Sequence, residues 1–495
     1  MARTYRLSKS RFQSGLQCPK CLWLKVHAPE LADPLSERQQ AIFADGHRIG
    51  ELARKRFPGG VLVAEDHRYG AQALETTRRL LAEGVDAIYE AALEHDGVFV
   101  RADVLVRRGE AWDLVEVKSS TSCKPEHLTD AAVQAYVVEG AGLRLGRVYV
   151  MHLDNTYVYE GGEYDLERLF ALADLTDPVR AYLPCVPGEV RRMLALLAGE
   201  CPDVRIGKHC GKPYDCAFMG HCHAFLPEFP VTEIPRISSE VLDALLDDGI
   251  ECILDVPPAH PGLTAKQREV CQVIQAGRLL VKGDIGKTLV RLTSPVHFLD
   301  FETFKPALPL YPGTRPHQQL PFQFSDHVMR SDGSLEHREF LHGAEGDPRP
   351  AFVRALLQAV DGKGSVVVYT GFENTVLSAL ARDLPEHAER IGGIRRRLFD
   401  LHDVVADHVR HPDFHGSTSI KYVLPALVDD LSYDGLAIRD GDAAMLRYEA
   451  AARGEIAGEE RERLFADLRA YCGTDTMAMV RLYERFGEMA LEAAG

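Results

Sequence analysis

The sequence has no apolar run long enough to cross a bilayer, and it carries less positive than negative charge. Its 495 residues hold 57 Lys and Arg against 73 Asp and Glu, a formal net charge of −16. The first absence argues against a membrane role. The second means that the overall field repels phosphate, so a nucleic-acid partner needs local basic surface or bound metal ions.

The eleven cysteines are an odd number, which does not suit a secreted framework of paired disulfides. The chain is also far above the size at which small domains need such staples. We therefore expect a protein of the reducing cytoplasm. Six Lys and Arg precede the first acid, Glu30, as in a transit peptide, but no apolar h-region accompanies them. We interpret this segment as part of the mature protein.

The chain is too long for one hydrophobic core, so we expect two α/β domains and a small helical connector, with bounds 1–228, 229–294 and 295–495. The connector holds two short helical pieces around a DG turn, which fit either a plain helical pair or a helix-hairpin-helix-like module. Hydrophobic periodicity predicts helices at 36–56, 71–84, 127–142 and from 165 to about 200. It predicts strands at 86–95, 97–108, 111–120, 147–153, 296–304, 320–330, 334–343 and 365–370.

Two expected strands of the first domain carry residues suited to phosphodiester hydrolysis. Glu116 and Lys118 are two positions apart, so their side chains share one face of a strand, and Asp103 lies on the preceding strand. Two neighbouring carboxylates can hold a divalent cation that activates water, and a lysine stabilises the negative charge that builds on phosphorus. A solvated strand face with a Glu–Lys pair is the alternative.

This Asp…ExK arrangement is followed by a helix that carries Gln134. The combination resembles the core of PD-(D/E)XK nucleases of the RecB/AddB type and of the related CRISPR-adaptation nucleases, over roughly the first 225 residues. The resemblance implies a restriction-endonuclease-like fold, a divalent metal at Asp103 and Glu116, and a substrate-positioning role for Gln134.

Two positions depart from this family pattern. The family's Q-x-x-x-Y signature has Val138 in place of its tyrosine, with a tyrosine instead at Tyr136. The upstream G-x-x-x-H pattern begins at Gly46 but has Gly50 in place of its histidine. His47 lies at a different position of the pattern, so we assign it no role.

Three cysteines at C-x5-C-x5-C spacing, Cys210, Cys216 and Cys222, lie in a turn-rich stretch and indicate a common ligand. Zinc sites favour tighter C-x2-4-C pairs, whereas iron–sulfur clusters accept thiolates from irregular loops, so we favour a 4Fe-4S cluster over zinc. In iron–sulfur members of the same nuclease group, the cluster is bound by such a loop and by one N-terminal cysteine that a proline follows, as Pro19 follows Cys18 here. The resemblance therefore implies Cys18 as the fourth ligand.

Two other cysteines remain candidates for this fourth position. Cys21 is an alternative to Cys18, and Cys201 is a weaker one. The clamp joins the first turn of the chain to a loop nearly 200 residues later, so its loss should loosen the whole domain. We expect a structural role, with redox sensing as the alternative.

The last domain offers a second acidic group. Asp300 and Glu302 share one face of its first expected strand, and Tyr471 and Asp475, four residues apart, share one face of a helix. This D-x-E with a downstream Y-x3-D resembles the DEDDy 3′–5′ exonucleases of the ribonuclease H-like fold. The resemblance implies a third motif at VVVYTGFENT, where Glu373 stands in place of the usual aspartate.

The same resemblance implies two Mg²⁺ or Mn²⁺ ions held by the four carboxylates, with Tyr471 orienting the nucleophile. Asp400 in LFDLHDVV is the alternative third carboxylate. Scattered surface acids on a helical domain are the alternative to the whole site.

The order of an iron–sulfur RecB-like nuclease and a DEDDy domain, with the string LDFETFKPALPLYPGTRPHQQLPFQFS, resembles a prokaryotic family of fused nucleases over nearly the full chain. We therefore expect a metal-dependent nuclease that processes DNA ends in repair or defence and prefers DNA to RNA. If one site alone is active, we expect it to be the C-terminal one. The alternatives are a DNA-end-binding protein with inactive sites and an RNA-processing exonuclease. An iron–sulfur electron carrier would leave the carboxylates unexplained.

Overall fold

The computed structural model describes residues 5–65, 69–360 and 362–492. The chain is a mixed α/β protein with two mixed β-sheets flanked by helices. It divides into two compact units, Met1–Phe225 with Ala307–Gln318, and Leu226–Pro306 with Gln319–Gly495. The segment expected to be a connector belongs to the second unit. No described helix combines the length and the apolar character that crossing a bilayer requires.

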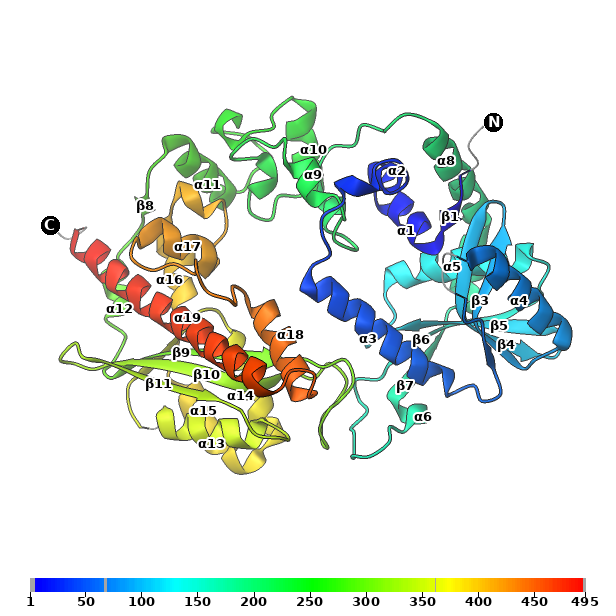
Figure 1. Cartoon of the computed structure of the whole chain (residues 1–495). Coiled ribbons are helices and arrows are strands. Elements are labelled where there is room, and N and C mark those ends of the chain that lie inside the picture. Colours follow the sequence, from blue (N-terminus) through cyan, green and yellow to red (C-terminus); the bar gives the residue numbers. More distant parts are fainter. Residues whose placement is uncertain (1–4, 66–68, 361, 493–495) are drawn as a thin grey trace. The chain divides into compact units, whose positions relative to one another are not determined.

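The first unit contains a seven-stranded sheet in the order β2-β3-β4-β5-β6-β7, with β1 paired to the start of β4 (Figure 1). Strands β3, β4 and β5 form an antiparallel meander, and β6 runs parallel to β5. The four strands predicted in this region are confirmed. The strands are β1 (Leu7–Ser8), β2 (Val61–Leu62), β3 (Ala87–His95), β4 (Val98–Arg108), β5 (Ala111–Lys118), β6 (Leu145–Leu153) and β7 (Phe170–Asp174).

The helices of the first unit pack on both faces of this sheet, in two hydrophobic cores. Helix α3 begins at a capping box formed by Ser36 and Gln39, and α4 ends at Gly84, whose φ of 73° suits a helix terminus. The helices are α1 (Lys9–Gln17), α2 (Pro19–His27), α3 (Glu37–Arg54), α4 (Gly70–Glu83), α5 (Pro125–Gly140), α6 (Leu166–Leu169), α7 (Thr176–Tyr182), α8 (Val186–Ala198) and α9 (Met219–His223). The expectation of helical structure throughout 165–200 is wrong, because β7 adds an edge strand there.

The second unit contains a five-stranded sheet in the order β11-β10-β9-β12-β13. Strands β9, β10 and β11 are antiparallel, whereas β12 and β13 run parallel to β9. The four strands predicted here are confirmed, and the short β13 was not expected. The strands are β9 (Val296–Phe304), β10 (Leu320–Met329), β11 (Leu335–Leu341), β12 (Ser365–Val368) and β13 (Leu398–Asp400), and a separate pair joins β8 (Leu280–Val281) to β14 (Val409–Arg410).

Alternation along β9 sends its side chains to two different cores. Leu299 and Phe301 pack with α13, α14 and α15, whereas Phe298 packs with α16, α17 and α19. Asp300 and Glu302 share the face of Phe298, the face that the long helix α19 crosses (Figure 1). The helices are α10 (Ser239–Asp247), α11 (Ala265–Ala276), α12 (Ile285–Leu289), α13 (Arg349–Ala359), α14 (Phe372–Asp383), α15 (Ala388–Arg395), α16 (Leu401–His408), α17 (Ile420–Leu427), α18 (Gly441–Ala452) and α19 (Gly458–Glu492).

Short 3-10 helices complete the described chain. They are η1 (Pro29–Leu31), η3 (Leu183–Cys185), η4 (Lys208–Cys210), η5 (Val231–Glu233), η6 (Ile253–Asp255), η7 (Pro385–His387) and η8 (Pro412–Phe414).

Candidate functional site

The first group of expected site residues lies on neighbouring strands, β4 and β5. Glu116 and Lys118 project from the same face of β5, and Lys118 Nζ donates a hydrogen bond to Glu116 Oε1 at 2.7 Å. Asp103 Oδ2 accepts a hydrogen bond of 2.7 Å from the backbone N–H of Val117, which lies between them. The strand pairing therefore brings Asp103, Glu116 and Lys118 into one place.

Two helices add side chains to this group. Lys9 of α1 donates to Glu116 Oε1 at 2.6 Å, and Gln134 of α5 donates to Glu116 Oε2 at 2.6 Å. Lys118 also donates to Asp130 of α5. Glu116 is 1% exposed, and both of its carboxylate oxygens are engaged by side chains. We name these five residues with Asp103 the ExK group.

The charges of the ExK group partly compensate one another. Burial raises the pKa of Glu116, but the nearby ammonium groups of Lys118 and Lys9 offset that effect and hold the pKa well below its ordinary value. Burial and the charge of Glu116 raise the pKa of Asp103 to about 8. Burial also raises the pKa of Asp130. Three carboxyl groups thus share two ammonium groups.

A cavity of about 350 Å³ opens beside the ExK group. Asp103 and Lys118 line one side of it, and Gly46, His47 and Gly50 of α3 line another. His47, to which the sequence pattern assigned no role, therefore faces the same space as two expected catalytic residues. Its Nδ1 lies 2.8 Å from the backbone oxygen of residue 43 in the same helix.

The cysteines surround a small cavity of about 20 Å³ in the first unit. Its lining includes the four expected ligands and also Cys21, whereas Cys201 is exposed and does not line it. The Cys21 thiol hydrogen-bonds Cys216, and this bond is the largest influence that lowers the pKa of Cys216 to about 6. The structure brings Cys18, Cys21, Cys210, Cys216 and Cys222 together, so the choice between Cys18 and Cys21 stays open.

Hydrogen bonds independent of the thiols join the N-terminal helices to the cysteine loop. Gln17 donates to the backbone oxygens of His209 and Tyr214 at 2.7 and 2.6 Å. Asp33 accepts from the backbone N–H of Gly220 at 2.9 Å. The loop is therefore held against α1 and α2 by the protein itself.

The spacing of the thiols bears on the ligand that they fit. A zinc ion bound at about 2.3 Å brings its thiolates within about 4 Å of one another. Among the described residues, two groups of three or more His, Cys, Asp or Glu side chains bring ligand atoms within 4.8 Å of one another, and neither lies in this loop. No three of the five described thiols around this cavity therefore lie within 4.8 Å of one another, the closeness that one zinc ion imposes on its ligands.

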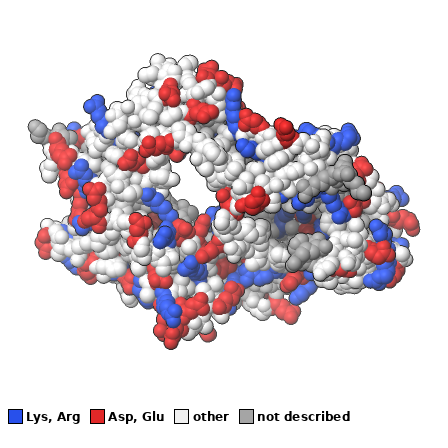
Figure 2. All heavy atoms as spheres, turned by 45° about the horizontal axis from the view of Figure 1, so that its top comes forward, with Lys and Arg blue, Asp and Glu red and all other residues white. Residues whose placement is uncertain are grey.

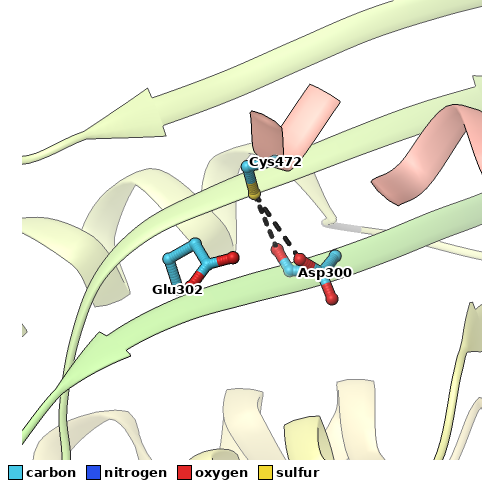
Figure 3. A group of neighbouring side chains, drawn as sticks. All are labelled: Asp300, Glu302 and Cys472. Atoms are coloured by element: carbon cyan, nitrogen blue, oxygen red, sulfur yellow. Dashed lines mark hydrogen bonds between the residues drawn. The ribbon is translucent and has the colours of Figure 1, made fainter. Parts of the chain in front are cut away.

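The second group of expected site residues lies between β9 and α19. Asp300 and Glu302 project from β9 toward Cys472 of α19, and their ligand atoms lie within 4.8 Å of one another (Figure 3). The Cys472 thiol donates to Asp300 Oδ2 at 3.6 Å. Cys472 was not predicted, although it adjoins the expected Tyr471.

Asp475 lies one helical turn after Tyr471 on α19. It accepts hydrogen bonds from the hydroxyl groups of Tyr471 and Tyr433, the latter at 2.6 Å. Tyr471 is buried. The structure therefore adds a second tyrosine to the expected pair.

The two candidates for the third carboxylate occupy different environments. Glu373, in the first turn of α14, is 1% exposed, and its Oε2 has no hydrogen-bond partner among the described residues. Asp400 accepts hydrogen bonds from the backbone N–H groups of Thr370 and His402 at 2.8 and 3.0 Å and caps α16. Glu373 Oε2 is thus free to bind a metal ion, whereas Asp400 already accepts backbone hydrogen bonds and caps a helix. We name Asp300, Glu302, Glu373 and Asp475 the carboxylate cluster.

Each member of the carboxylate cluster has a raised pKa, with burial as the largest cause. Repulsion from Asp475 and Glu373 adds to burial at Asp300 and Glu302, whose pKa values lie well above ordinary. The pKa of Glu373 rises to about 8 and that of Asp475 to about 6. Lys421 of α17 is the cation that lowers the pKa of Glu302 and Asp475.

The comparisons with known proteins reach only part of this chain. No curated protein matches it. Residues 297–419, about a quarter of the chain, match a family model described as "Domain of unknown function (DUF2779)". The matched range contains three members of the carboxylate cluster, Asp300, Glu302 and Glu373, and ends before α19.

Proposed function

We propose that the protein is a metal-dependent nuclease that processes DNA ends, and that the carboxylate cluster is its 3′–5′ exonuclease site. One observation carries this proposal. Four carboxyl groups, of which Glu302 and Glu373 are buried and Asp300 and Asp475 are half-buried, lie beside a tyrosine, and the pKa of each is raised chiefly by desolvation. Such a group is stabilised by divalent cations.

The topology of the second unit supports the same assignment. A central strand, β9, with an antiparallel meander through β10 and β11 on one side and the parallel strands β12 and β13 on the other is consistent with a ribonuclease H-like fold. The cluster draws its members from β9, the start of α14 and α19, which are the positions that the DEDDy resemblance implies.

Two Mg²⁺ or Mn²⁺ ions would be held by the four carboxylates, of which Asp300 and Glu302 have ligand atoms within 4.8 Å of each other. Bound there, such ions lower the pKa of water and offset charge on the leaving 3′-oxygen. Burial raises the pKa of Tyr471 well above its ordinary value, so this tyrosine keeps its proton, and its hydroxyl would donate to an attacking oxygen by turning away from Asp475. The unpartnered Oε2 of Glu373 is available as a ligand.

The ExK group supports a second hydrolytic site of PD-(D/E)XK type. Lys118 is placed to stabilise charge on a phosphate, and Asp103 lines the adjoining cavity. Because Lys9 and Lys118 both contact Glu116, a metal ion at Glu116 would compete with Lys9. This competition favours a second candidate role for the first unit, in which it binds a DNA end without cutting it.

The cysteine cavity supports a 4Fe-4S clamp held by four of its five thiols. When bound, the cluster would tie α1 and α2 to the loop between α8 and α9. Its expected role is structural, because it would join the same segments that Gln17 holds as a donor and Asp33 as an acceptor of hydrogen bonds.

The test is degradation of end-labelled single- and double-stranded DNA and RNA with Mg²⁺ or Mn²⁺, on protein prepared without oxygen. Wild type is compared with Asp300→Ala and Lys118→Ala. We expect Asp300→Ala to abolish removal of 3′-terminal nucleotides. If neither substitution changes the products, the two-site proposal fails, and inactivity of the wild type on every substrate supports the binding role. Faster cutting of RNA than of DNA would reassign the substrate.

A separate measurement tests the cluster. Iron–sulfur proteins are brown, with charge-transfer absorbance at about 400 nm. Cys216→Ser should remove this band and the bound iron together. A colourless wild type with one equivalent of zinc would replace the cluster by a zinc ion.

A further inference from the structure

A cavity of about 630 Å³ lies within the second unit, and no member of the carboxylate cluster lines it. One wall comes from α11 and the residues that precede α10, and the other from α16, η8 and the loop at 416–418. Its volume lies in the range of ligand sites. The described lining contains no Asp or Glu, and its basic and imidazole side chains are Arg236, Lys266, His402, Arg410 and His411.

Two of these cations are available to a ligand. Arg236 and Lys266 are exposed, and neither forms an ion pair or a side-chain hydrogen bond with another described residue. Arg410, in contrast, is buried, donates to three backbone carbonyl oxygens, and lies 3.2 Å from Glu269. Arg236 and Lys266 therefore supply positive charge that the protein does not neutralise.

The walls of the cavity are fixed by contacts between the connector and the loop after η8. His415 lies 2.9 Å from Glu233 and stacks on Phe229 with ring centroids 5.1 Å apart. Gly416 has a φ of 71°, and a Cβ there would lie 2.3 Å from the backbone oxygen of Glu233. The connector thus docks closely on this loop, so the cavity is built into the unit.

The same loop leads from the cavity to the carboxylate cluster. Thr418 lines the cavity and lies 2.8 Å from His402 Nε2 through its hydroxyl oxygen. Helix α17 begins two residues later, and its Lys421 acts electrostatically on Glu302 and Asp475. Lys421 therefore follows Thr418 of the cavity wall by three positions in the chain.

We propose that this cavity binds the phosphodiester backbone of a single-stranded nucleic acid whose end lies at the carboxylate cluster. The inference rests on the nuclease function proposed for that cluster. Arg236 and Lys266 contact phosphates, and the hydroxyl groups of Thr264 and Ser417 donate to them. The connector thereby acquires a role in holding substrate.

Local basic sites of this kind are what a chain of net charge −16 requires. On the face shown in Figure 2, basic side chains are interspersed with acidic ones. Phosphate attraction on such a surface comes from small groups of cations that lie apart from acids.

The experiment measures binding without turnover. Fluorescence anisotropy follows a labelled oligothymidylate on Asp300→Asn protein in EDTA, over a series of salt concentrations. The test variant is Arg236→Glu/Lys266→Glu, with Arg236→Ala/Lys266→Ala as a milder form. The matched control, Lys363→Glu/Arg382→Glu, makes the same charge change at exposed positions that do not line the cavity. Thermal unfolding checks that each variant folds.

We expect the test variant to weaken binding by about tenfold or more at low salt, and the control to change it little. Each lost phosphate contact lowers the slope of log affinity against log salt by about 0.7 for single strands, so the slope should fall by about 1.4. Equal affinity and equal slope in the test variant and the matched control would overturn the inference. So would thymidine monophosphate binding that depends on Arg236 and Lys266 while oligothymidylate binding does not, because the cavity would then be a mononucleotide site.

The two proposals fail in different ways. Failure of the nuclease function appears as a lack of cleavage by wild type with Mg²⁺ or Mn²⁺. Failure of the present inference appears in affinity and salt slope, which are measured without cleavage.

Discussion

The two acidic groups of this protein differ in how their negative charge is balanced. In the ExK group, Lys9 and Lys118 contact Glu116 directly, and the pKa of Glu116 lies well below its ordinary value. In the carboxylate cluster, every member has a raised pKa, and Lys421 is its nearby cation. The first group carries its own counter-charges, whereas the second lacks them.

This difference has consequences for metal binding. A cation that enters the carboxylate cluster relieves repulsion among its acids, and no ammonium group of a described residue forms an ion pair with them. A cation that enters the ExK group has to displace Lys9 from Glu116 or bind beside it. Hence we expect the cluster to bind metal more tightly, and the predictions below test that ranking.

The largest effect is expected from Asp300→Asn, which removes one central charge of the cluster. Exonuclease activity should fall by about a thousandfold or more, because the metal ions that activate water and stabilise the leaving oxygen lose a carboxylate ligand. The measurement is the rate of 3′-nucleotide release from 5′-labelled single strands with Mn²⁺. Asp434→Asn, at an exposed position, is the control. Residual activity within about tenfold of wild type would move the chemistry to the ExK group.

Lys9→Met tests the built-in counter-charge of the first site. Loss of one partner leaves Glu116 buried with less compensation, and the free energy of unfolding of the first unit should fall by about 2 kcal/mol in urea titrations. Lys55→Met, exposed on the same unit, should change it little. Mn²⁺ should restore part of the loss, since it can take the place of the ammonium group. Equal stability of the two variants would mean that the Lys9–Glu116 pair contributes nothing.

The ion pair at Lys9 also illustrates what the sequence could predict. Asp103, Glu116 and Lys118 were predictable because strand alternation and short spacing place them together. Lys9 lies 107 positions before Glu116, and no local pattern joins the two. Asp130 could also have been predicted, because it precedes Gln134 by one helical turn and so shares its face of the helix.

The second unit shows the same division between local and long-range information. Alternation in β9 and helical spacing in α19 predicted the faces of Asp300, Glu302, Tyr471 and Asp475. Tyr433 reaches Asp475 from a loop between α17 and α18, which has no periodic pattern. Strand β7 was missed because its five residues lie between helical segments, too few for a period of two to stand out.

Metal binding should stabilise the protein chiefly through the carboxylate cluster. At a Mn²⁺ concentration about 100 times the dissociation constant, the gain is about 2.7 kcal/mol, or roughly 5–10 °C in melting temperature. Asp300→Asn/Glu302→Gln should remove most of this shift, and Asp103→Asn should retain it. The reverse order would contradict the ranking of the two sites.

Without metal, stability should depend on pH through the same cluster. A carboxyl group with a raised pKa binds its proton more tightly in the folded state, so its stabilisation is present below its unfolded pKa and is lost as pH rises through the folded value. With Glu373 at about 8 and Asp475 at about 6, the loss falls between about pH 5 and pH 8. In EDTA, the melting temperature should decrease over this range by about 5 °C, and Glu373→Gln should flatten the decrease. A rise over this range would show that the cluster is already compensated.

The smallest effect concerns Gly50 of α3, which lines the cavity beside the ExK group. A Cβ added there meets no atom within 4 Å, so Gly50→Ala should raise the free energy of unfolding by about 0.5–1 kcal/mol through helix propensity. The added methyl group also narrows the space shared with Asp103 and Lys118. If the first unit binds DNA through this cavity, the more stable variant should bind a DNA end less tightly, whereas Gly188→Ala in α8, where a Cβ is equally free of contacts, should leave that affinity unchanged. Unchanged affinity in Gly50→Ala would place the DNA outside the cavity beside the ExK group.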